Sequence, residues 1–290
     1  MAANTRDIRR RIKSVKNTAQ ITKAMQMVAA SKMRKAQQRA LAGRPYAELL
    51  NKVIVSVRDR VESEAHPLLE QREVKKELVI LISTDKGLCG ALNTNLFREA
   101  GTFDPSITQF IASGRKGVAW SARNKRDLVA DFALGDTPTF AQCKAVSKMA
   151  LEKFLSGEVD KVTVVYTHFV NTLAQQPVKQ VLLPISELEL PGAKAEATAE
   201  SSDPAGAYLF EPNAASVLDA ILPFYVHHEL YEMILDARAS EQSARMVAMK
   251  SATDNAKELI KDLTLVYNKQ RQSAITSELL EITTAMKALE

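Results

Sequence analysis

The sequence predicts a Rossmann-like α/β domain in the middle of the chain and two long terminal helices that pair as a protruding, antiparallel coiled coil. Glycine and proline are absent from the first 42 residues and again from residues 224–290, which favours long uninterrupted helices. Between them, short β-branched apolar runs alternate with helical segments, as they do in sheets with parallel strands. We therefore expect an N-terminal helix over 1–62, an α/β domain over 75–190, a flexible loop over 191–206 and a C-terminal helix over 207–290.

Composition supports an ordered protein with a real core. The 290 residues are 46% hydrophobic and 25% charged, shares typical of soluble globular chains. No apolar run approaches the roughly 18 residues that a membrane-spanning helix needs. Cys89 and Cys143 stand far apart with no CxxC pair, so we predict that neither forms a disulfide or binds a metal.

The N-terminal segment has the apolar spacing of a helix whose buried face rotates slowly along its length. This rotation follows because 3.6 residues per turn does not divide seven. Gly43 and Pro45 are expected to interrupt or bend the helix, which then resumes to about residue 62. The predicted stripe comprises Ile8, Ile12, Val15, Ala19, Ile21, Met25, Val28, Met33 and Ala36.

The C-terminal segment steps by three and four residues in the same way. If residues 224–290 were helical throughout, they would extend roughly 100 Å at 1.5 Å per residue, so the rod must protrude from any compact domain. Small residues in both stripes allow a close antiparallel approach, but a coiled coil with so little Leu and Ile is weak by itself. We therefore expect other protein to enclose part of the rod. Its predicted seam is Leu230, Met233, Ala237, Ser240, Ala244, Val247 and Ser251.

Positive charge is concentrated at the start of the chain. Residues 1–45 hold twelve Lys or Arg and one acid, Asp7, a balance of +11 in a chain whose net charge is +5. A targeting peptide, a nucleic-acid or anionic-membrane arm, and a helix face that slides within an acidic protein partner all fit this pattern, as does a plain solvated face. The targeting interpretation is weakened because the helical pattern continues past residue 35 without a cleavage site.

The middle of the chain predicts a mostly parallel sheet. Strands are expected over 77–83, 107–113, 161–171 and 177–185, with a helix over 138–157. The segment 191–206 is rich in Ala, Ser, Pro and acids without periodicity, which predicts a flexible loop. "YLFEP" (208–212) fits an edge strand.

No catalytic, cofactor or metal site is predicted. "GLCG" and "GRKG" follow strands, where phosphate-binding turns occur, but the full GxGxxG and GxxxxGK[ST] patterns are absent. Tight packing turns explain both; a nucleotide site and an RNA-binding GxxG loop remain alternatives. The four histidines have no ligand spacing, and His227 and His228 are expected at the surface.

Three long stretches resemble one known family. "TRDIRRRIKSVKNTAQITKAMQMVAASKMRKAQ", "STDKGLCGALNTN" and "SEQSARMVAMKSATDNAKELIKDLTLVYNKQRQSAITSELLEI" are similar, in order, to the gamma-subunit family of F-type ATP synthases. The resemblance runs from Arg6 to Ile282. It departs where the family has Gly-Ala and this chain has Ala285 and Met286, and the cysteine insert of chloroplast members is missing, so we expect no thiol control.

The resemblance implies a non-catalytic central-stalk rotor shaft that couples proton flow to ATP synthesis or hydrolysis. Its implied partners are three alpha and three beta subunits, the epsilon subunit and the membrane c-ring, with no nucleic acid, cofactor or direct small-molecule substrate. The implied location is the cytoplasmic side of the bacterial inner membrane, peripherally bound. The implied contacts with catalytic subunits are Met25, Arg245, Arg271, Gln272, Thr276 and Glu278, although packing within the coil also explains Met25 and Thr276. The implied foot on the rotor ring and epsilon is Tyr208, Phe210 and Glu211.

Two other classes of protein remain open on the sequence. A basic coiled-coil nucleic-acid-binding protein would explain the +11 start and predicts binding that falls steeply with salt. A Rossmann-type enzyme would explain the middle and predicts an acid about 20 residues beyond the glycine turn. Asp104 is near that distance but lies in "TFDPS", which predicts a loop.

Overall fold

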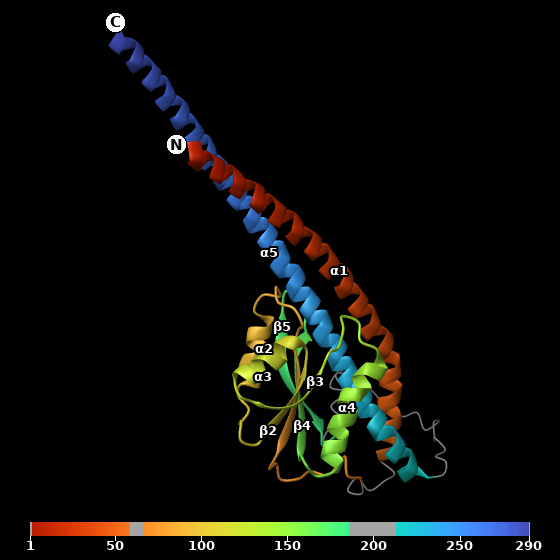
Figure 1. The fold of residues 1–290 in the computed structure, drawn as a ribbon. Coiled ribbons are helices and arrows are strands. Elements are labelled where there is room, and N and C mark those ends of the chain that lie inside the picture. Colours follow the sequence, from red (N-terminus) through yellow and green to blue (C-terminus); the bar gives the residue numbers. More distant parts are fainter. Residues whose placement is uncertain (1, 59–65, 186–212, 290) are drawn as a thin grey trace. The chain divides into compact units, whose positions relative to one another are not determined.

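The computed structural model describes residues 2–58, 66–185 and 213–289, although several side chains near residues 40–58 and the chain ends are not described (Figure 1). The described residues form two compact units. One unit joins Met1–Ala30 with Arg245–Glu290, and the other is Ser31–Ala244. The long helices α1 (Ala2–Arg58) and α5 (Ala214–Leu289) contribute a segment to each unit.

The first unit is a pair of antiparallel helical segments, as the sequence predicts (Figure 1). The facing line on α1 includes Ile8, Thr22 and Ala29, all buried. Across from it on α5 lie Thr253 and Ala256, also buried, and the hydroxyl oxygens of Thr22 and Thr253 are 2.7 Å apart. Towards its C-terminus α5 continues beyond the start of α1 as a single helix (Figure 1).

The predicted stripe on α1 is wrong at two positions. Ile21 is 60% exposed and Val28 is 55% exposed, whereas their smaller neighbours Thr22 and Ala29 are buried. Small side chains at the contact let two helices approach closely, so the larger residues are left on the outside. The shift of one residue follows from the mismatch between the helical period and a fixed three-four count.

The second unit is a three-layer α/β domain around a five-stranded sheet of order β3-β2-β1-β4-β5. The strands are β1 (Glu77–Ile82), β2 (Thr108–Ser113), β3 (Asp127–Phe132), β4 (Lys161–Phe169) and β5 (Gln175–Leu183). The first four are parallel and β5 pairs antiparallel with β4, which confirms the prediction of a mostly parallel sheet.

Helices cover both faces of this sheet (Figure 1). Leu96 of α2 (Leu92–Ala100) and Trp120 of α3 (Arg115–Arg123) pack with Val79 and Phe110 on one face. On the other face, α4 (Phe140–Leu155) and the segment of α5 within this unit supply a larger core from residues such as Phe154, with Leu222 and Leu230 on α5. Strands buried on both faces read as continuous apolar runs, which is why "ELVILI" lacks alternation.

Two local features differ from what the sequence indicates. Strand β3 was not predicted, because Asp127 and Asp131 interrupt its apolar run and its edge position leaves it only half-buried. The expected interruption at Gly43 and Pro45 is wrong, because helix α1 continues through both residues. Tyr46 packs on the rings of Phe224 and His228, so tertiary contacts outweigh the local cost of a proline.

The predicted C-terminal seam is divided between different neighbours. Ala237 belongs to the core of the α/β domain, and Ala244 packs with Cys89 and Leu92 of that domain. Ser251 is exposed, so it is not a seam residue. The prediction that this set faces the N-terminal helix is therefore wrong, because a three-four count cannot say which of two partners a buried face meets.

Candidate functional site

The outer face of α1 in the two-helix unit carries exposed apolar residues. Met27 is 60% exposed, as is Ile21, and Val28 is 55% exposed. Exposed single apolar side chains are ordinary, but three within eight residues of one helix are a candidate contact for a protein partner. Ile21 and Val28 lie within about 20° of each other around the helix, and Met27 lies about 100° or more from both.

Exposed cationic side chains lie on the same helix, most of them before Ile21 along the chain. Among the described residues, none of these side chains takes part in an ion pair, and the helix start contains a single acid, Asp7. Farther along α1, Lys32 does pair with Asp136, at 2.6 Å. The exposed set is Arg6, Arg9, Arg10, Arg11, Lys13, Lys16 and Lys23.

Met25 and Arg245 are less exposed to solvent than residues that face outward towards another subunit would be. Met25 is partly buried, and Arg245 is only 8% exposed and already interacts within the protein. Thr22 meets Thr253, so Met25 lies about one turn from that pair and Arg245 about two turns from it. Both stand in the same stretch of the coil, and their contact with another subunit remains a prediction.

Four polar residues lie on the exposed far end of α5. All four are solvent-exposed, and the Thr276 hydroxyl donates to the Gln272 carbonyl at 3.0 Å. At about 100° per residue, Arg271 and Glu278 lie within about 20° of each other around the helix, and Gln272 and Thr276 within about 40°. The predicted contact set therefore forms two rows on different sides of the helix.

The same end of α5 carries apolar residues that we did not predict as functional. They are about half to two-thirds exposed. At about 100° per residue, all of them except Leu280 lie within about 60° of one another around the helix, so they form one exposed apolar stripe. An apolar stripe on a helix typically faces other protein. The signal was present in the sequence as steps of four, three and four residues. The residues are Ile275, Leu279, Leu280, Ile282 and Met286.

The predicted foot lies outside the described residues. Tyr208, Phe210 and Glu211 fall in 186–212, as do the predicted loop 191–206 and the predicted edge strand 208–212.

The glycine turn "GRKG" of the α/β domain serves packing. Gly114 has φ of +97°, and a Cβ placed there would stand 2.4 Å from the Ser83 carbonyl oxygen. The backbone N–H of Gly117 donates to the Ser83 hydroxyl at 2.7 Å, and that of Arg115 donates to Asp85 at 3.1 Å. A carboxylate and a hydroxyl thus occupy the N-terminus of α3, where a phosphate would otherwise bind.

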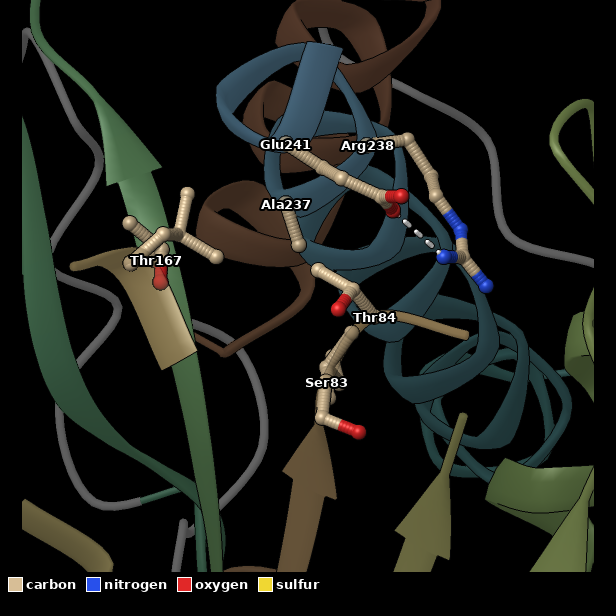
Figure 2. A pocket seen from close by; sticks show the side chains of 8 residues that line it. Ser83, Thr84, Thr167, Ala237, Arg238 and Glu241 are labelled. Atoms are coloured by element: carbon tan, nitrogen blue, oxygen red, sulfur yellow. Dashed lines mark hydrogen bonds and ion pairs between the residues drawn. The ribbon is translucent and has the colours of Figure 1, made fainter. Parts of the chain in front are cut away.

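A buried ion pair lies within α5, near the end of strand β1. Arg238 and Glu241 are 2.8 Å apart, with side chains 2% and 3% exposed. A second guanidinium nitrogen of Arg238 donates to the Leu134 carbonyl at 2.6 Å. Figure 2 shows the pair beside Ser83 and Thr84 at the end of β1, with Thr167 of β4 across the small pocket. The sequence did not reveal this pair, because its i,i+3 spacing is also that of a surface pair.

The histidine prediction is wrong in part. His227 and His228 are each 7% exposed, and His227 bonds the Ser147 hydroxyl at 2.6 Å. Burial lowers the pKa of both, which holds them neutral. Asp104, by contrast, lies in a loop as expected, where its carboxylate accepts from the backbone and side chain of Ser106.

Burial also acts on Glu229, on the same segment of α5. Burial and the nearby Glu232 raise the pKa of this carboxyl to about 7.

Within the described ranges, no group of three or more His, Cys, Asp or Glu side chains could hold a metal ion. Cys89 and Cys143 are buried, and they are not joined to each other by a disulfide.

Comparison with known proteins gives concordant results. A family model described as ATP synthase matches residues 4–289. The ATP synthase gamma chain of Methylacidiphilum infernorum is 50% identical over 293 residues, covering 99% of each chain. That of Opitutus terrae is 51% identical over 291 residues, with the same coverage of both.

Solved structures agree on the fold. The matching chain in the central stalk and c-ring of the Tetrahymena thermophila mitochondrial ATP synthase has a TM-score of 0.60 at 28% identity, over 80% of this chain and 99% of that one. A chain of the Euglena gracilis mitochondrial ATP synthase in rotational state 3 has a TM-score of 0.69 at 21% identity, over 100% of this chain and 95% of that one. The second likeness concerns the fold alone.

Proposed function

Because the chain belongs to the gamma-subunit family of F-type ATP synthases, it is a non-catalytic rotor shaft of the central stalk, and we propose how its surface performs that role. The exposed faces of the two-helix unit bear on the surrounding alpha and beta subunits. The observation that carries the proposal is the outer side of α1, where Ile21, Met27 and Val28 are exposed on a helix whose exposed cations form no ion pair within the described part of the chain.

The chemistry of this face suits a surface that must turn. Methionine and alanine side chains make adaptable contacts that do not interlock with a partner. The interaction energy therefore does not strongly favour any one orientation of the shaft within the ring. Exposed ion pairs contribute only about 0–1 kcal/mol each, so the cations can exchange partners on acidic loops as the shaft rotates. The acid-poor surface of α1 is explained by such acidic loops on the surrounding subunits.

The exposed end of α5 supplies the second bearing surface. Its two polar rows, Arg271 with Glu278 and Gln272 with Thr276, face different directions and would meet catalytic subunits in different rotational states. The apolar residues around them, such as Leu279 and Leu280, would be enclosed by the same ring. Met25 and Arg245 contribute where the two helices pair, about one and two turns from the contact between Thr22 and Thr253.

The partners of the foot follow from the same family role. The Tetrahymena neighbour is part of a central stalk with its c-ring, and we infer that the residues Tyr208, Phe210 and Glu211 rest on the rotor ring and epsilon subunit here. The coupling lets ion flow through the ring drive ATP synthesis, or ATP hydrolysis drive ion pumping.

The location follows from the complex. None of the described helices is long and apolar enough to cross a membrane. We propose a peripheral position on the cytoplasmic side of a bacterial inner membrane, in line with the bacterial relatives. Fractionation with protease protection on inverted vesicles tests this: the chain should be cut in inverted vesicles and spared in right-side-out ones.

Photo-crosslinking tests the bearing surfaces directly. A photoreactive amino acid at Thr276, which is exposed, should give an adduct with a catalytic subunit in the assembled complex. The same group at Lys144, exposed on α4, is the matched control and should give none. Equal yields at both positions, or none at Thr276, would refute the assignment.

A nucleic-acid role predicts a different measurement. If the cations of α1 served DNA, the free chain would bind a duplex with an affinity that falls steeply as salt rises. The shaft proposal predicts that the assembled complex shows no such binding, because the ring encloses that helix.

A further inference from the structure

The coil of the two-helix unit contains a buried polar contact that its bearing role does not require. Thr22 of α1 is 9% exposed and Thr253 of α5 is 3% exposed, and their hydroxyl oxygens are 2.7 Å apart. The buried residues around them are small or flexible: Ala29, Met249 and Ala256. A hydrogen bond between two helices is directional, whereas contacts among alanines are not.

Both hydroxyls also reach a carbonyl of their own helix. Thr22 lies 3.1 Å from the Ala19 carbonyl oxygen, and Thr253 lies 2.8 Å from that of Met249. Each hydroxyl has one proton to donate. One threonine therefore donates to its own helix while the other donates across the gap, and no proton is left without an acceptor. The contacts of 2.7 Å and 2.8 Å are shorter than the contact of 3.1 Å between Thr22 and the Ala19 carbonyl. They favour the arrangement in which Thr253 donates to the Met249 carbonyl and Thr22 donates to Thr253.

A slip of one helix along the other would break this arrangement. One turn away from Thr253 on the buried face stand Met249 and Ala256, and neither side chain can accept a hydrogen bond well. The small apolar neighbours alone would tolerate such a slip, because alanine meets alanine or methionine at little steric cost. The hydroxyl pair is thus the contact that distinguishes the observed alignment from alignments shifted by a turn.

We propose that Thr22 and Thr253 fix the register of the antiparallel coil and so act as positioning residues of the shaft. Single buried polar residues set alignment in other coiled coils, usually without adding stability. This register determines how far apart Met25 and Arg245 stand along the axis of the coil. They lie about one and two turns from the pair of threonines. That consequence rests on the proposed function, whereas the register role itself does not.

The test compares the register of the wild-type full chain with that of Thr22→Val, Thr253→Val and the double variant. Valine matches threonine in shape, and each single change leaves the other hydroxyl its own helix carbonyl, so folding should survive. Nitroxide labels on cysteines placed at the exposed positions Arg9 and Asn255 report alignment. Along the axis of the coil the two labelled positions are separated by about 16 Å, and a slip of one helical turn changes that separation by about 5.4 Å. The native cysteines are buried.

The matched controls are Thr18→Val and Thr264→Val. Both threonines are exposed and bond only a carbonyl of their own helix, at 3.1 Å and 2.7 Å. We expect a single narrow distance distribution for wild type and both controls. The double variant should show a broadened or second population shifted by several ångströms, and Thr22→Ser with Thr253→Ser should restore one population.

Two results would overturn the proposal. One is an unchanged distance distribution in the folded double valine variant. The other is equal broadening in the controls, which would mean that any loss of a threonine loosens the coil. In the assembled complex, the double variant should pump fewer ions per ATP hydrolysed. If the wild-type chain failed to assemble with alpha and beta subunits, the proposed function would fall, but the distance result would still decide the register role.

Discussion

Removing Arg238 should strongly destabilise the α/β domain. Its guanidinium is 2% exposed, pairs with Glu241 at 2.8 Å and donates to the Leu134 carbonyl at 2.6 Å. Arg238→Met keeps the volume but leaves a carboxylate that is 3% exposed without this cation. Breaking one side of such a buried pair costs about 3–5 kcal/mol. For a domain of this size, that lowers Tm by about 6–20 °C.

The double variant Arg238→Met/Glu241→Leu separates the charge effect from packing. Replacing both members of a buried pair by apolar residues is often neutral or stabilising, although the Leu134 carbonyl still loses its donor at about 1–3 kcal/mol. We expect the double variant to unfold within about 2 kcal/mol of wild type.

The assay is urea unfolding followed by the fluorescence of Trp120, the single tryptophan, which stacks on Phe97 at 5.4 Å within the domain. The matched control is Lys148→Met, which removes an exposed partner of Glu152 and should change stability by less than about 1 kcal/mol. A single variant as stable as this control, or a double variant no better than the single, would refute the reasoning.

Four further outcomes follow from the structure. Isothermal titration of the chain alone with Mg-ATP should show no tight one-to-one site, because protein groups already occupy the N-terminus of α3; a saturable site would contradict this. Gly114→Ala should cost about 1–3 kcal/mol in the Trp120 unfolding assay, since its φ is +97° and the new Cβ would stand 2.4 Å from a carbonyl oxygen, whereas Gly87→Ala, with open space around it, should not. Deleting about ten residues from 191–206 should leave assembly intact, because that composition cannot bury apolar area; failure to enter the complex would make the segment structural. Glu229 has a folded pKa of about 7, above the ordinary value of 4.5, so its protonated form stabilises the fold; wild type should lose stability relative to Glu229→Gln as pH rises from 4.5 to about 7, and parallel pH profiles would contradict this.

The sequence was most informative where one pattern runs through a long element. The absence of glycine and proline predicted both terminal helices, and apolar runs such as "ELVILI" predicted the parallel strands. The half-buried edge strand β3 was not predicted, because Asp127 and Asp131 dilute its apolar signal. The continuity of α1 past Pro45 was missed because it depends on contacts between Tyr46 and the distant Phe224.

The candidate site shows more clearly that a local sequence pattern does not reveal contacts between distant segments. Periodicity identifies that a helix has a buried face, but a rotation of one residue decides whether Ile21 or Thr22 occupies it, and only packing against α5 settles the choice. Likewise, Arg238 and Glu241 resemble a surface pair in the sequence and become a buried one through the position of Leu134. The contact residues Arg271, Gln272, Thr276 and Glu278 came from family resemblance, and their exposure is compatible with that role.

Single-molecule rotation tests the shaft function most directly. The ring of alpha and beta subunits, assembled with this chain, is fixed to a surface, and a bead is attached through a cysteine placed at Lys125, an exposed residue just after α3. We predict stepwise rotation in one direction when ATP is added and none without it. A complex that hydrolyses ATP with the chain incorporated while the bead remains stationary would contradict the account.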